Sequence, residues 1–359
     1  MTRAIGVISG TSMDGIDVAL LDGDGETAQA GPGATYPYPS EVAARLRTVV
    51  ADPMKAAGPL DDLEREVTDA HVAAVEAFLA DHAIPRATVA LVGLHGQTVL
   101  HRPAERYTRQ LCDGARAADR LGIDVVCDFR SADVAAGGEG APLVPLYHAA
   151  LAQGLARPLM FLNWGGVGNV TYLGAGEEIV AFDTGPANAP LDDFVGRRLG
   201  LSHDENGALA ASGRVHDDLV ATWMQDPYFR RPAPKSLDRN HFQALVASVE
   251  LLSDADGAAT LAAFTIEATA AALAQVPEPP QRWLVCGGGR RNATLMARLG
   301  RRLGVAVEPV EAIGQDGDFV EAACFAHLAL RSRRGLALSL PSTTGVPRPL
   351  TGGAFWTKA

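Results

Sequence analysis

Residues 4–21 read Ala-Ile-Gly-Val-Ile-Ser-Gly-Thr-Ser-Met-Asp-Gly-Ile-Asp-Val-Ala-Leu-Leu, and this stretch indicates the fold more strongly than any other part of the chain. Apolar residues at 4–8 and 16–21 flank turn-forming residues at 9–15, which predicts a β-hairpin with a polar, glycine-bounded tip. A second unit of this kind spans 158–173, where Gly165 and Gly166 separate two apolar runs. Residue identity between the two units is slight, so we predict a duplicated α/β unit rather than a tandem sequence repeat.

Hydrophobic periodicity and turn residues predict the other elements of an α/β fold. Helices are expected at 40–51, 61–82, 188–199, 215–225, 240–252, 257–275 and 318–331 and from Asn292 onward, and strands at 88–94, 123–127, 179–182 and 282–286. A glycine-rich run at 135–142 interrupts regular structure, and prolines near the C-terminus favour an extended tail. We therefore predict a first lobe of residues 1–135 plus a tail of about 340–359, and a second lobe of residues 136–339.

The composition is that of a globular protein with about two domains: 359 residues, 47% hydrophobic and 20% charged. A net charge of −11 argues against nucleic-acid or membrane partners. The four cysteines match neither a disulfide framework nor a zinc pattern, which favours a reducing cytoplasm. We see neither a signal-peptide core nor an 18-residue apolar stretch, and without a Gly-Lys dipeptide a Walker A loop is excluded.

Three glycine turns, at 9–15, 165–168 and 287–289, each follow an apolar strand. Backbone N–H groups in such turns can approach an anion closely, and in open α/β sheets ligands bind at the carboxyl ends of strands. Together the three turns predict a polyphosphate site. The simpler alternative is that each group of glycines only allows a tight turn.

Asp183 ends a strand and is a candidate general base that takes a proton as a phosphoryl group is transferred. The alternative is an Asx-turn or the N-cap of the helix that begins near Asn188. Asp14, at the tip of the first hairpin, would repel phosphates unless a metal ion or water intervened. The sequence assigns no residue to a metal.

Two polar segments follow apolar strands in the first lobe and could line a substrate pocket: His95 to Thr98, and Arg130 with Asp133. The guanidinium of Arg130 suits a substrate carboxylate, because it can donate two parallel hydrogen bonds. Alternatively, Arg130 and Asp133 only pair with each other, and His95 is a satisfied core histidine. Glu321 could likewise only complement the N-terminus of the last helix.

These motifs resemble those of the anhydro-N-acetylmuramic acid kinases, a family of the actin-like superfamily that includes sugar kinases and heat-shock chaperones. The resemblance extends over essentially the full length. Its motifs are Ile5 to Asp17, His95 to Thr98, Asp128 to Arg130, Asp133 to Pro145, Asn163 to Gly166 with Asn169, Phe182 to Pro186 with Asn188, Pro234 to Ser236, Gly287 to Gly289 with Asn292, and Glu321-Ala322. Cys112, Trp164 and Ala187 differ from the residues usual in the family.

The resemblance implies a two-lobed actin-like ATPase (ribonuclease H-like) fold with an interdomain nucleotide cleft. It also implies that ATP and Mg²⁺ are the cofactors, that a homodimer forms, and that water and ATP open the 1,6-anhydro ring and phosphorylate O6 of a murein-derived amino sugar. Asp183 would be the base that activates water.

The remaining roles are also implied by the resemblance. The first phosphate hairpin would comprise Gly10, Thr11, Ser12, Met13, Asp14, Gly15, Ile16 and Asp17; the second phosphate loop Gly165, Gly166 and Asn169; and the nucleotide-side turn Gly287, Gly288, Gly289 and Asn292. Arg130 would bind the lactyl carboxylate, and the other sugar-binding residues would be His95, Gln97, Thr98, Asp133, Thr184 and Glu321.

Two other functions fit parts of this pattern. A nucleotide-switched binding protein would use the same phosphate turns to move its lobes on a protein partner, but would not need Arg130 and Glu321 in the cleft. A hexokinase-like enzyme would phosphorylate a free sugar without opening a ring. Only the family motifs separate it from the leading hypothesis.

Overall fold

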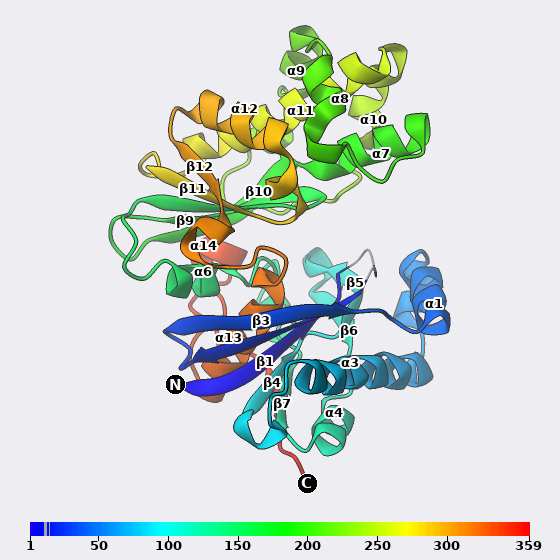
Figure 1. Cartoon of the computed structure of the whole chain (residues 1–359), viewed down its shortest axis with the longest axis vertical. Coiled ribbons are helices and arrows are strands. Elements are labelled where there is room, and N and C mark those ends of the chain that lie inside the picture. Colours follow the sequence, from blue (N-terminus) through cyan, green and yellow to red (C-terminus); the bar gives the residue numbers. More distant parts are fainter. Residues whose placement is uncertain (11–12, 14) are drawn as a thin grey trace. The chain divides into compact units, whose positions relative to one another are not determined.

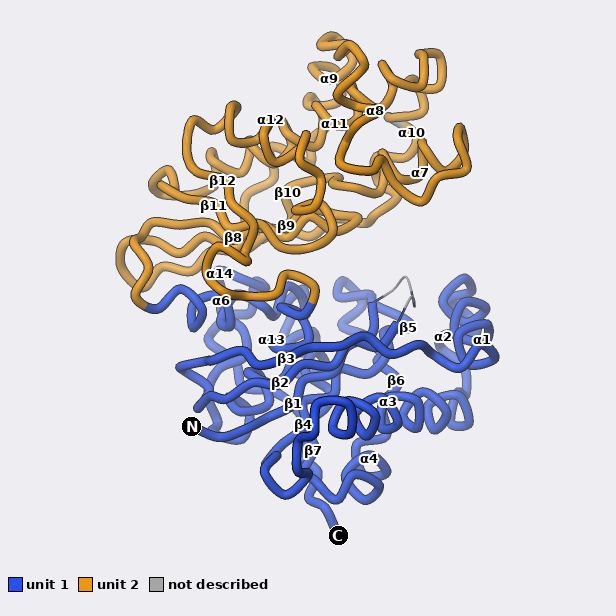
Figure 2. The backbone as a smooth tube through the Cα atoms, in the orientation of Figure 1, with its two compact units in different colours: residues 1–153, 319–359 blue, residues 154–318 orange. Residues whose placement is uncertain are grey.

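The computed structural model describes residues 1–10, 13 and 15–359 and divides into two compact units (Figure 2). Unit 1 comprises Met1–Gln153 and Phe319–Ala359, and unit 2 comprises Gly154–Asp318. Each unit has an apolar core of its own.

Unit 1 contains a six-stranded sheet in the order β13-β7-β4-β1-β2-β3 (Figure 1). β1 and β2 are antiparallel, with Ile8 opposite Asp17, which confirms the predicted hairpin. β4 and β7 continue the sheet in parallel, and a separate hairpin is formed by β5 and β6. The strands are β1 (Thr2–Ile8), β2 (Ile16–Gly23), β3 (Ala28–Tyr36), β4 (Leu91–Leu94), β5 (Gln97–Arg102), β6 (Tyr107–Leu111), β7 (Asp124–Cys127) and β13 (Ala354–Trp356).

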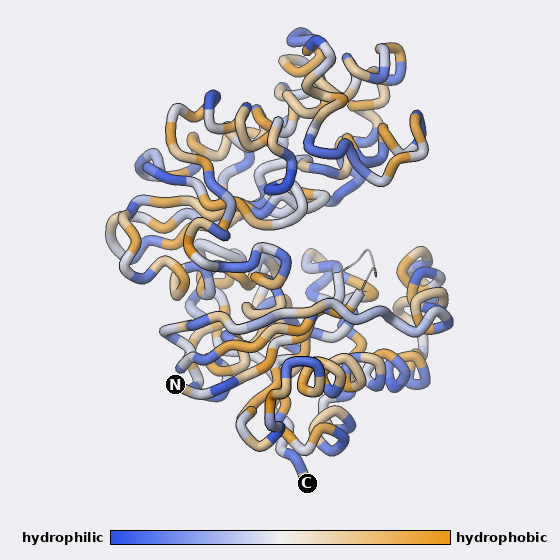
Figure 3. Tube along the Cα trace, viewed as in Figure 1, coloured by the Kyte–Doolittle hydropathy of each residue, from blue (hydrophilic) through white to orange (hydrophobic). Residues whose placement is uncertain are grey.

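Helices cover both faces of this sheet. On one face, Leu63, Val67 and Phe78 of α3 share a core with Ile5 and Val7 of β1. On the other face, α13 packs against β1, β2 and β4. Hydrophobic residues follow the central strands, whereas α3 also carries a hydrophilic side (Figure 3). The helices are α1 (Ser40–Val50), α2 (Pro53–Ala57), α3 (Asp61–Asp81), α4 (Gly114–Leu121), α5 (Ser131–Ala135), α6 (Pro145–Leu151), α13 (Val320–Arg333) and α14 (Pro341–Thr344).

Unit 2 contains a five-stranded sheet in the order β10-β9-β8-β11-β12. The order repeats β3-β2-β1-β4-β7 of unit 1, with two antiparallel neighbours on one side of the first strand and two parallel ones on the other. This agreement confirms the duplicated α/β unit. The strands are β8 (Leu159–Trp164), β9 (Val167–Leu173), β10 (Ile179–Pro186), β11 (Arg282–Cys286) and β12 (Ala306–Pro309).

The helices of unit 2 pack around α11, which contributes Ala258, Leu261 and Phe264 to the core. By length and apolar composition, the segment Asp254–Gln275 could cross a membrane, but 72% of its most apolar window is buried inside the protein, as in a core helix. A hydropathy window therefore detects a segment that an unbroken apolar run does not. The helices are α7 (Asn188–Leu199), α8 (Ala208–Ser212), α9 (Asp217–Trp223), α10 (Gln243–Val246), α11 (Asp254–Ala270) and α12 (Ala293–Leu303).

Two predicted elements differ from the structure. The helix expected at 240–252 is only the short α10, followed by a 3-10 turn at Ala247–Leu251. The tail expected to be extended contains α14, and its β13 adds an antiparallel strand to β7. β3 was not predicted, because Gly31, Pro32 and Gly33 are typical of a loop; a proline is tolerated there since β3 is an edge strand.

Candidate active site

Three polar side chains of unit 2 lie in one row across neighbouring strands. Asn163 of β8 pairs with Asn169 of β9, and Asn169 pairs with Asp183 of β10. Paired residues share a face of a sheet, and their chain neighbours Leu162, Trp164, Val170 and Phe182 belong to the apolar core on the opposite face. All three are half-buried. The row therefore presents one carboxylate and two amides on the sheet face opposite that core.

Asp183 is held at its backbone and at its carboxylate. Its N–H donates to the carbonyl of Lys235 (2.9 Å), and its own carbonyl accepts from the hydroxyl of Tyr228 (2.6 Å). The carboxylate Oδ2 accepts from the N–H of Leu237 (2.8 Å). The N-cap position of α7 is Ala187, and no side chain caps it, so the N-cap interpretation of Asp183 is wrong.

Thr184 follows in a bulge, where the register between β9 and β10 shifts. Its hydroxyl is buried and, among the residues that the structure describes, has no hydrogen-bond partner. Bulges bend a strand and re-aim its side chains, and they are common next to active sites.

Gly287 makes the turn after β11 and requires glycine. Its φ is +73°, and a Cβ there would lie 2.2 Å from Oδ1 of Asn163. Asn292 closes the same turn as the N-cap of α12, because its side chain accepts from the N–H of Leu295 (3.0 Å). The helix predicted to start near Asn292 is thereby confirmed. Gly289 is equally crowded, because a Cβ there would lie 2.5 Å from Cβ of Trp164. A glycine turn that leads into a helix N-terminus is a favourable place for an anion.

A cavity of about 440 Å³ opens beside this turn, within unit 2, and its volume falls in the range of ligand pockets. Gly288, Gly289 and Asn292 line it, whereas Gly165 and Gly166 do not; their carbonyls instead accept from the first N–H groups of α7. Burial raises the pKa of Asp192 in this wall to about 6. The other lining residues are Asn188, Leu191, Ser202, His203, Asp204, Glu205, Asn206 and Arg291.

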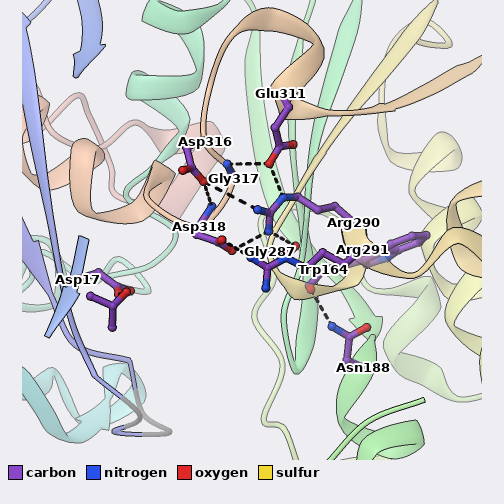
Figure 4. A network of polar contacts seen from close by, with 11 residues as sticks. Asp17, Trp164, Asn188, Gly287, Arg290, Arg291, Glu311, Asp316, Gly317 and Asp318 are labelled. Atoms are coloured by element: carbon purple, nitrogen blue, oxygen red, sulfur yellow. Dashed lines mark hydrogen bonds and ion pairs between the residues drawn. The ribbon is translucent and has the colours of Figure 1, made fainter. Parts of the chain in front are cut away.

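Arg290 is hydrogen-bonded to the glycine turn, as Figure 4 shows. Its side chain is only 5% exposed and donates to the Gly287 carbonyl (3.1 Å), Glu311 (2.8 Å) and Asp318 (2.9 Å). The paired carboxylates raise the pKa of the guanidinium despite burial, which acts in the opposite direction. A permanently charged, buried arginine therefore fixes the shape of the turn.

Unit 1 has a separate cavity of about 280 Å³ that brings three of the predicted sugar-binding residues together: His95, Thr98 and Arg130. Arg130 donates through Nε to His95 Nε2 (3.0 Å) and through Nη1 to the Gly140 carbonyl (2.6 Å). Its Nη2 has no hydrogen-bond partner within the described part of the chain. The remaining lining residues are Ile8, Ser9, Gly10, His101 and Ala141.

His95 is a buried histidine that also orients Arg130. Burial, and secondly the charge of Arg130, hold its pKa well below the usual value, so the ring is neutral. Nε2 then accepts from Arg130 while Nδ1 donates to the Gly96 carbonyl (2.9 Å). The guanidinium is thus held without a competing charge.

Gln97 and Asp133 do not line this cavity. Gln97 Oε1 accepts from Ser9 (2.5 Å) and Tyr38 (3.3 Å), which ties β5 to the end of β1. Asp133 accepts from the Gly140 N–H (2.7 Å) and the Thr344 hydroxyl (2.6 Å), and it makes no ion pair with Arg130. The interpretation of Arg130 and Asp133 as a simple local pair is therefore wrong.

Glu321 lies in the first turn of α13, where a negative charge complements the helix dipole. Its charge also favours the charged form of Arg130, although burial dominates and lowers the pKa of that guanidinium. One turn later, the Phe325 ring lies 4.6 Å from the His95 ring. The first two turns of α13 therefore contribute one charge and one aromatic ring to the surroundings of Arg130 and His95.

The first predicted phosphate hairpin is described only in part, since Thr11, Ser12 and Asp14 lie outside the described residues. Met13 is buried with φ of +57°, and its N–H donates to the Gly10 carbonyl (3.1 Å). Gly15 and Ile16 lead into β2, where Asp17 accepts from Thr35 (2.6 Å). Among the residues described, no group of three His, Cys, Asp or Glu side chains could hold a metal ion.

Sequence reasoning missed several residues of these sites. Arg290 directly follows the three glycines, and His101 follows the Gln97 motif, so proximity to a motif was the available signal. Tyr228 and Lys235 contact Asp183 from more than 40 residues away in sequence; Lys235 belongs to the Pro234 to Ser236 motif, to which the sequence assigned no role. No local pattern predicts such a contact.

A family model described as anhydro-N-acetylmuramic acid kinase matches residues 2–358. Two curated relatives bear that name: one from Rhodospirillum rubrum, 53% identical over 99% of this chain and 94% of the relative, and one from Paramagnetospirillum magneticum, 52% identical over 98% of each. Among solved structures, the Acidaminococcus fermentans (R)-2-hydroxyglutaryl-CoA dehydratase component A superposes with a TM-score of 0.51 at 10% identity, covering 93% of this chain and 100% of that one. That likeness is one of fold alone. With the two sheet orders, it confirms the predicted α/β fold of the actin-like type.

Proposed function

Because the chain belongs to the anhydro-N-acetylmuramic acid kinase family, a family of sugar kinases in cell-wall recycling, we propose that it opens the 1,6-anhydro ring of its substrate hydrolytically while phosphorylating O6. The products are N-acetylmuramic acid 6-phosphate and ADP. The observation that carries the proposal is the polar row of Asn163, Asn169 and Asp183, with its single carboxylate oriented by the Leu237 N–H.

Asp183 is the general base. It takes a proton from water, the water oxygen bonds to the anomeric carbon, and the bond from that carbon to O6 breaks. O6 forms a bond to the γ-phosphorus of ATP, and ADP leaves with the electron pair of the broken phosphoanhydride bond. One carboxylate thus serves both bond changes.

ATP is the phosphoryl donor. The Gly287 turn, where a Cβ would collide with Asn163 and the Trp164 backbone, and the N-terminus of α12 suit phosphates. The adjoining 440 Å³ cavity suits the nucleoside. The family resemblance, rather than the cavity, assigns further phosphate contacts to Gly165 and Gly166 and to the first hairpin from Gly10 to Asp17. Mg²⁺ would be held by the triphosphate itself, because no group of three His, Cys, Asp or Glu side chains among the described residues could hold it, and it would neutralise phosphate charge.

Arg130 binds the lactyl carboxylate of the sugar through its unpartnered Nη2, and His95, Thr98 and Glu321 surround the ring. Thr184 contacts the sugar beside the base. Gln97 and Asp133 contribute by holding the walls of the cavity, as their hydrogen bonds suggest.

The enzyme acts as a homodimer in the cytoplasm. None of the four cysteines, all of which are described, forms a disulfide, and this favours a reducing compartment. The negative net charge supports the absence of nucleic-acid and membrane partners. We assign the first phosphate hairpin and the carboxylate pocket to the first lobe, with the base and the nucleotide turn in the second.

The reaction is tested with purified protein, ATP, 1,6-anhydro-N-acetylmuramic acid and ¹⁸O-labelled water. We expect a 6-phosphosugar with the label at the anomeric hydroxyl. Unlabelled substrate processed in ordinary water and then moved to labelled water controls for spontaneous anomeric exchange. Release of inorganic phosphate without a phosphosugar would contradict the kinase reaction and favour a nucleotide-switched binding protein.

The role of Asp183 is tested with Asp183→Asn, which keeps the shape of the side chain but removes its basicity. We expect kcat to fall by about 10²- to 10⁴-fold, with ATP binding and the unfolding midpoint near those of the unaltered protein. Asp217→Asn, the same change at an exposed residue of α9, is the matched control and should leave kcat unchanged. Undiminished turnover by Asp183→Asn would remove it as the base.

A further inference from the structure

Strand β10 has a bulge directly after Asp183, where the position of the proposed base must be well defined. The β9–β10 register shifts between Asp183 and Gly185, so the ladder is interrupted directly after Asp183 and resumes in a shifted register at Gly185. A bulge loosens local pairing and changes the direction of the side chains around it. Another element must therefore fix the conformation of Asp183.

The segment from Tyr228 to Leu237 supplies the missing contacts. The Lys235 carbonyl accepts from the N–H of Asp183 (2.9 Å), and the Tyr228 hydroxyl donates to the Asp183 carbonyl (2.6 Å). The Leu237 N–H donates to the Asp183 carboxylate (2.8 Å). Three bonds from one segment to one residue fix both the backbone and the side-chain direction of Asp183.

Lys235 connects the two ends of this segment through its side chain. Its side chain is buried, and its Nζ donates to the Tyr228 carbonyl (3.0 Å) and lies 4.4 Å from the centroid of the Tyr228 ring. A buried ammonium is expensive unless it is well partnered, and an apolar residue would fill the space at lower cost. Its presence here therefore points to a role beyond packing.

The Tyr228 ring is held independently of its hydroxyl. Phe229 and Phe242 pack edge-on against it, at centroid distances of 5.7 and 6.1 Å. Removing the hydroxyl alone should thus leave the ring in place, which makes its contribution separable from packing.

We propose that Tyr228 and Lys235 are positioning residues for Asp183: the Tyr228 hydroxyl fixes the carbonyl of the base, and Lys235 holds Tyr228 in place and supplies a positive charge that favours the ionised carboxylate. This inference rests on the proposed role of Asp183 as the base. The charged groups whose fields reach Lys235 are Asp183 and Arg231, and burial is the main cause that lowers the pKa of Lys235 to about 8.

The test compares Tyr228→Phe, Lys235→Met and Lys235→Arg by steady-state kinetics, normalised to the folded fraction. We expect the first two to lower kcat about 5- to 10-fold while KM for ATP and for the sugar stays within about 2-fold, since one hydrogen bond or one favourable charge is lost. Lys235→Arg keeps the charge and should restore part of kcat. Phe194→Leu, at a buried residue of α7 in the same unit 2 core, is the control and should lower stability but not kcat.

The pH profile of kcat adds a readout that a purely structural role would not move. Losing the positive charge raises the pKa of a nearby carboxylate, so Lys235→Met should shift the acid limb to higher pH, whereas Lys235→Arg should not. Wild-type kcat and an unshifted limb in both Tyr228→Phe and Lys235→Met would overturn the inference, as would a rise in KM alone. If Asp183→Asn stays active, Asp183 is not the base, and this result is independent of the other variants. If Lys235→Met does not fold, Tyr228→Phe still tests the inference.

Discussion

Arg130 enters the unit 1 cavity with a guanidinium that two protein groups already orient. His95 and the Gly140 carbonyl engage Nε and Nη1, so Nη2 is directed without further ordering of the side chain. Preorganisation of this kind lets a ligand carboxylate bind at a small entropic cost. The same arrangement explains why a neutral histidine, rather than a second cation, lies beside it.

Arg130→Ala should therefore raise KM for the sugar about 10- to 100-fold, corresponding to the loss of a charged hydrogen bond of roughly 1.5–3 kcal/mol. KM for ATP should change by less than about 2-fold. Arg47→Ala, at an exposed position of α1, is the control and should change neither value. Equal increases in both KM values would identify Arg130 as a structural residue instead.

For single residues, the sequence predicted which polar side chains follow a strand, but not the hydrogen-bond partner of each side chain. Arg130 and Asp133 are three residues apart and read as a pair, yet Asp133 bonds Thr344, more than 200 residues away in the chain. Long-range partners of this kind depend on the tertiary fold, and a local spacing contains no information about them.

Among the elements, α13 approaches the unit 1 sheet closely at Gly6 of β1. A Cβ at Gly6 would lie 1.8 Å from the carbonyl oxygen of Ala322, a backbone atom that cannot rotate away. Gly6→Ala should lower the free energy of unfolding by about 3 kcal/mol or more, at or above the upper end of overpacking effects. Urea unfolding followed by circular dichroism measures this. Gly58→Ala, where a Cβ would make only ordinary contact, is the control, and equal stability of the two variants would refute the close approach.

The pairing of α3 with α4 predicts a dependence on pH. Asp69 of α3 accepts from Arg116 (2.6 Å), and this bond, with a further contribution from Arg120, lowers the pKa of Asp69. A lowered pKa gives stability that is present above the unfolded-state pKa and is lost as the pH falls through the folded-state pKa. Because the side chain is about a third exposed, the effect should not exceed about 1 kcal/mol.

Asp69→Asn should accordingly be less stable than the unaltered protein at pH 7 and equally stable at strongly acidic pH, measured by urea unfolding. Asp217→Asn, an exposed carboxylate in α9, should show no such difference. A deficit that persists unchanged in acid would mean that the substitution acts through packing rather than through charge.

For the whole molecule, the sequence predicted the two hairpins and the α/β class correctly, because these depend on local alternation and turn residues. The boundaries of α3 and α7 were also predicted within a residue or two. The pairing of β13 with β7 and the packing of α13 on β1 join C-terminal elements to strands more than 200 residues earlier in the chain. No periodicity records such pairings, which only the burial of complementary surfaces determines.

Unit 1 is built from two separate segments of the chain, so we expect the two units to differ in their ability to fold as isolated fragments. Unit 2 is one continuous segment, 154–318, with a complete five-stranded sheet and three buried tryptophans: Trp164, Trp223 and Trp283. We expect that fragment to fold alone, with blue-shifted tryptophan fluorescence and cooperative urea unfolding.

The fragment 1–153 should not fold by itself, because it lacks α13, and one face of β1 and β4 would be left exposed to water. Co-expression with residues 319–359 should restore it, since that segment supplies both α13 and the edge strand β13. Near-ultraviolet circular dichroism and urea titration of 1–153, alone and with 319–359, distinguish the two states. Cooperative unfolding of 1–153 alone would mean that the sheet of unit 1 is stable with one face uncovered, and that the C-terminal segment docks on a core already formed.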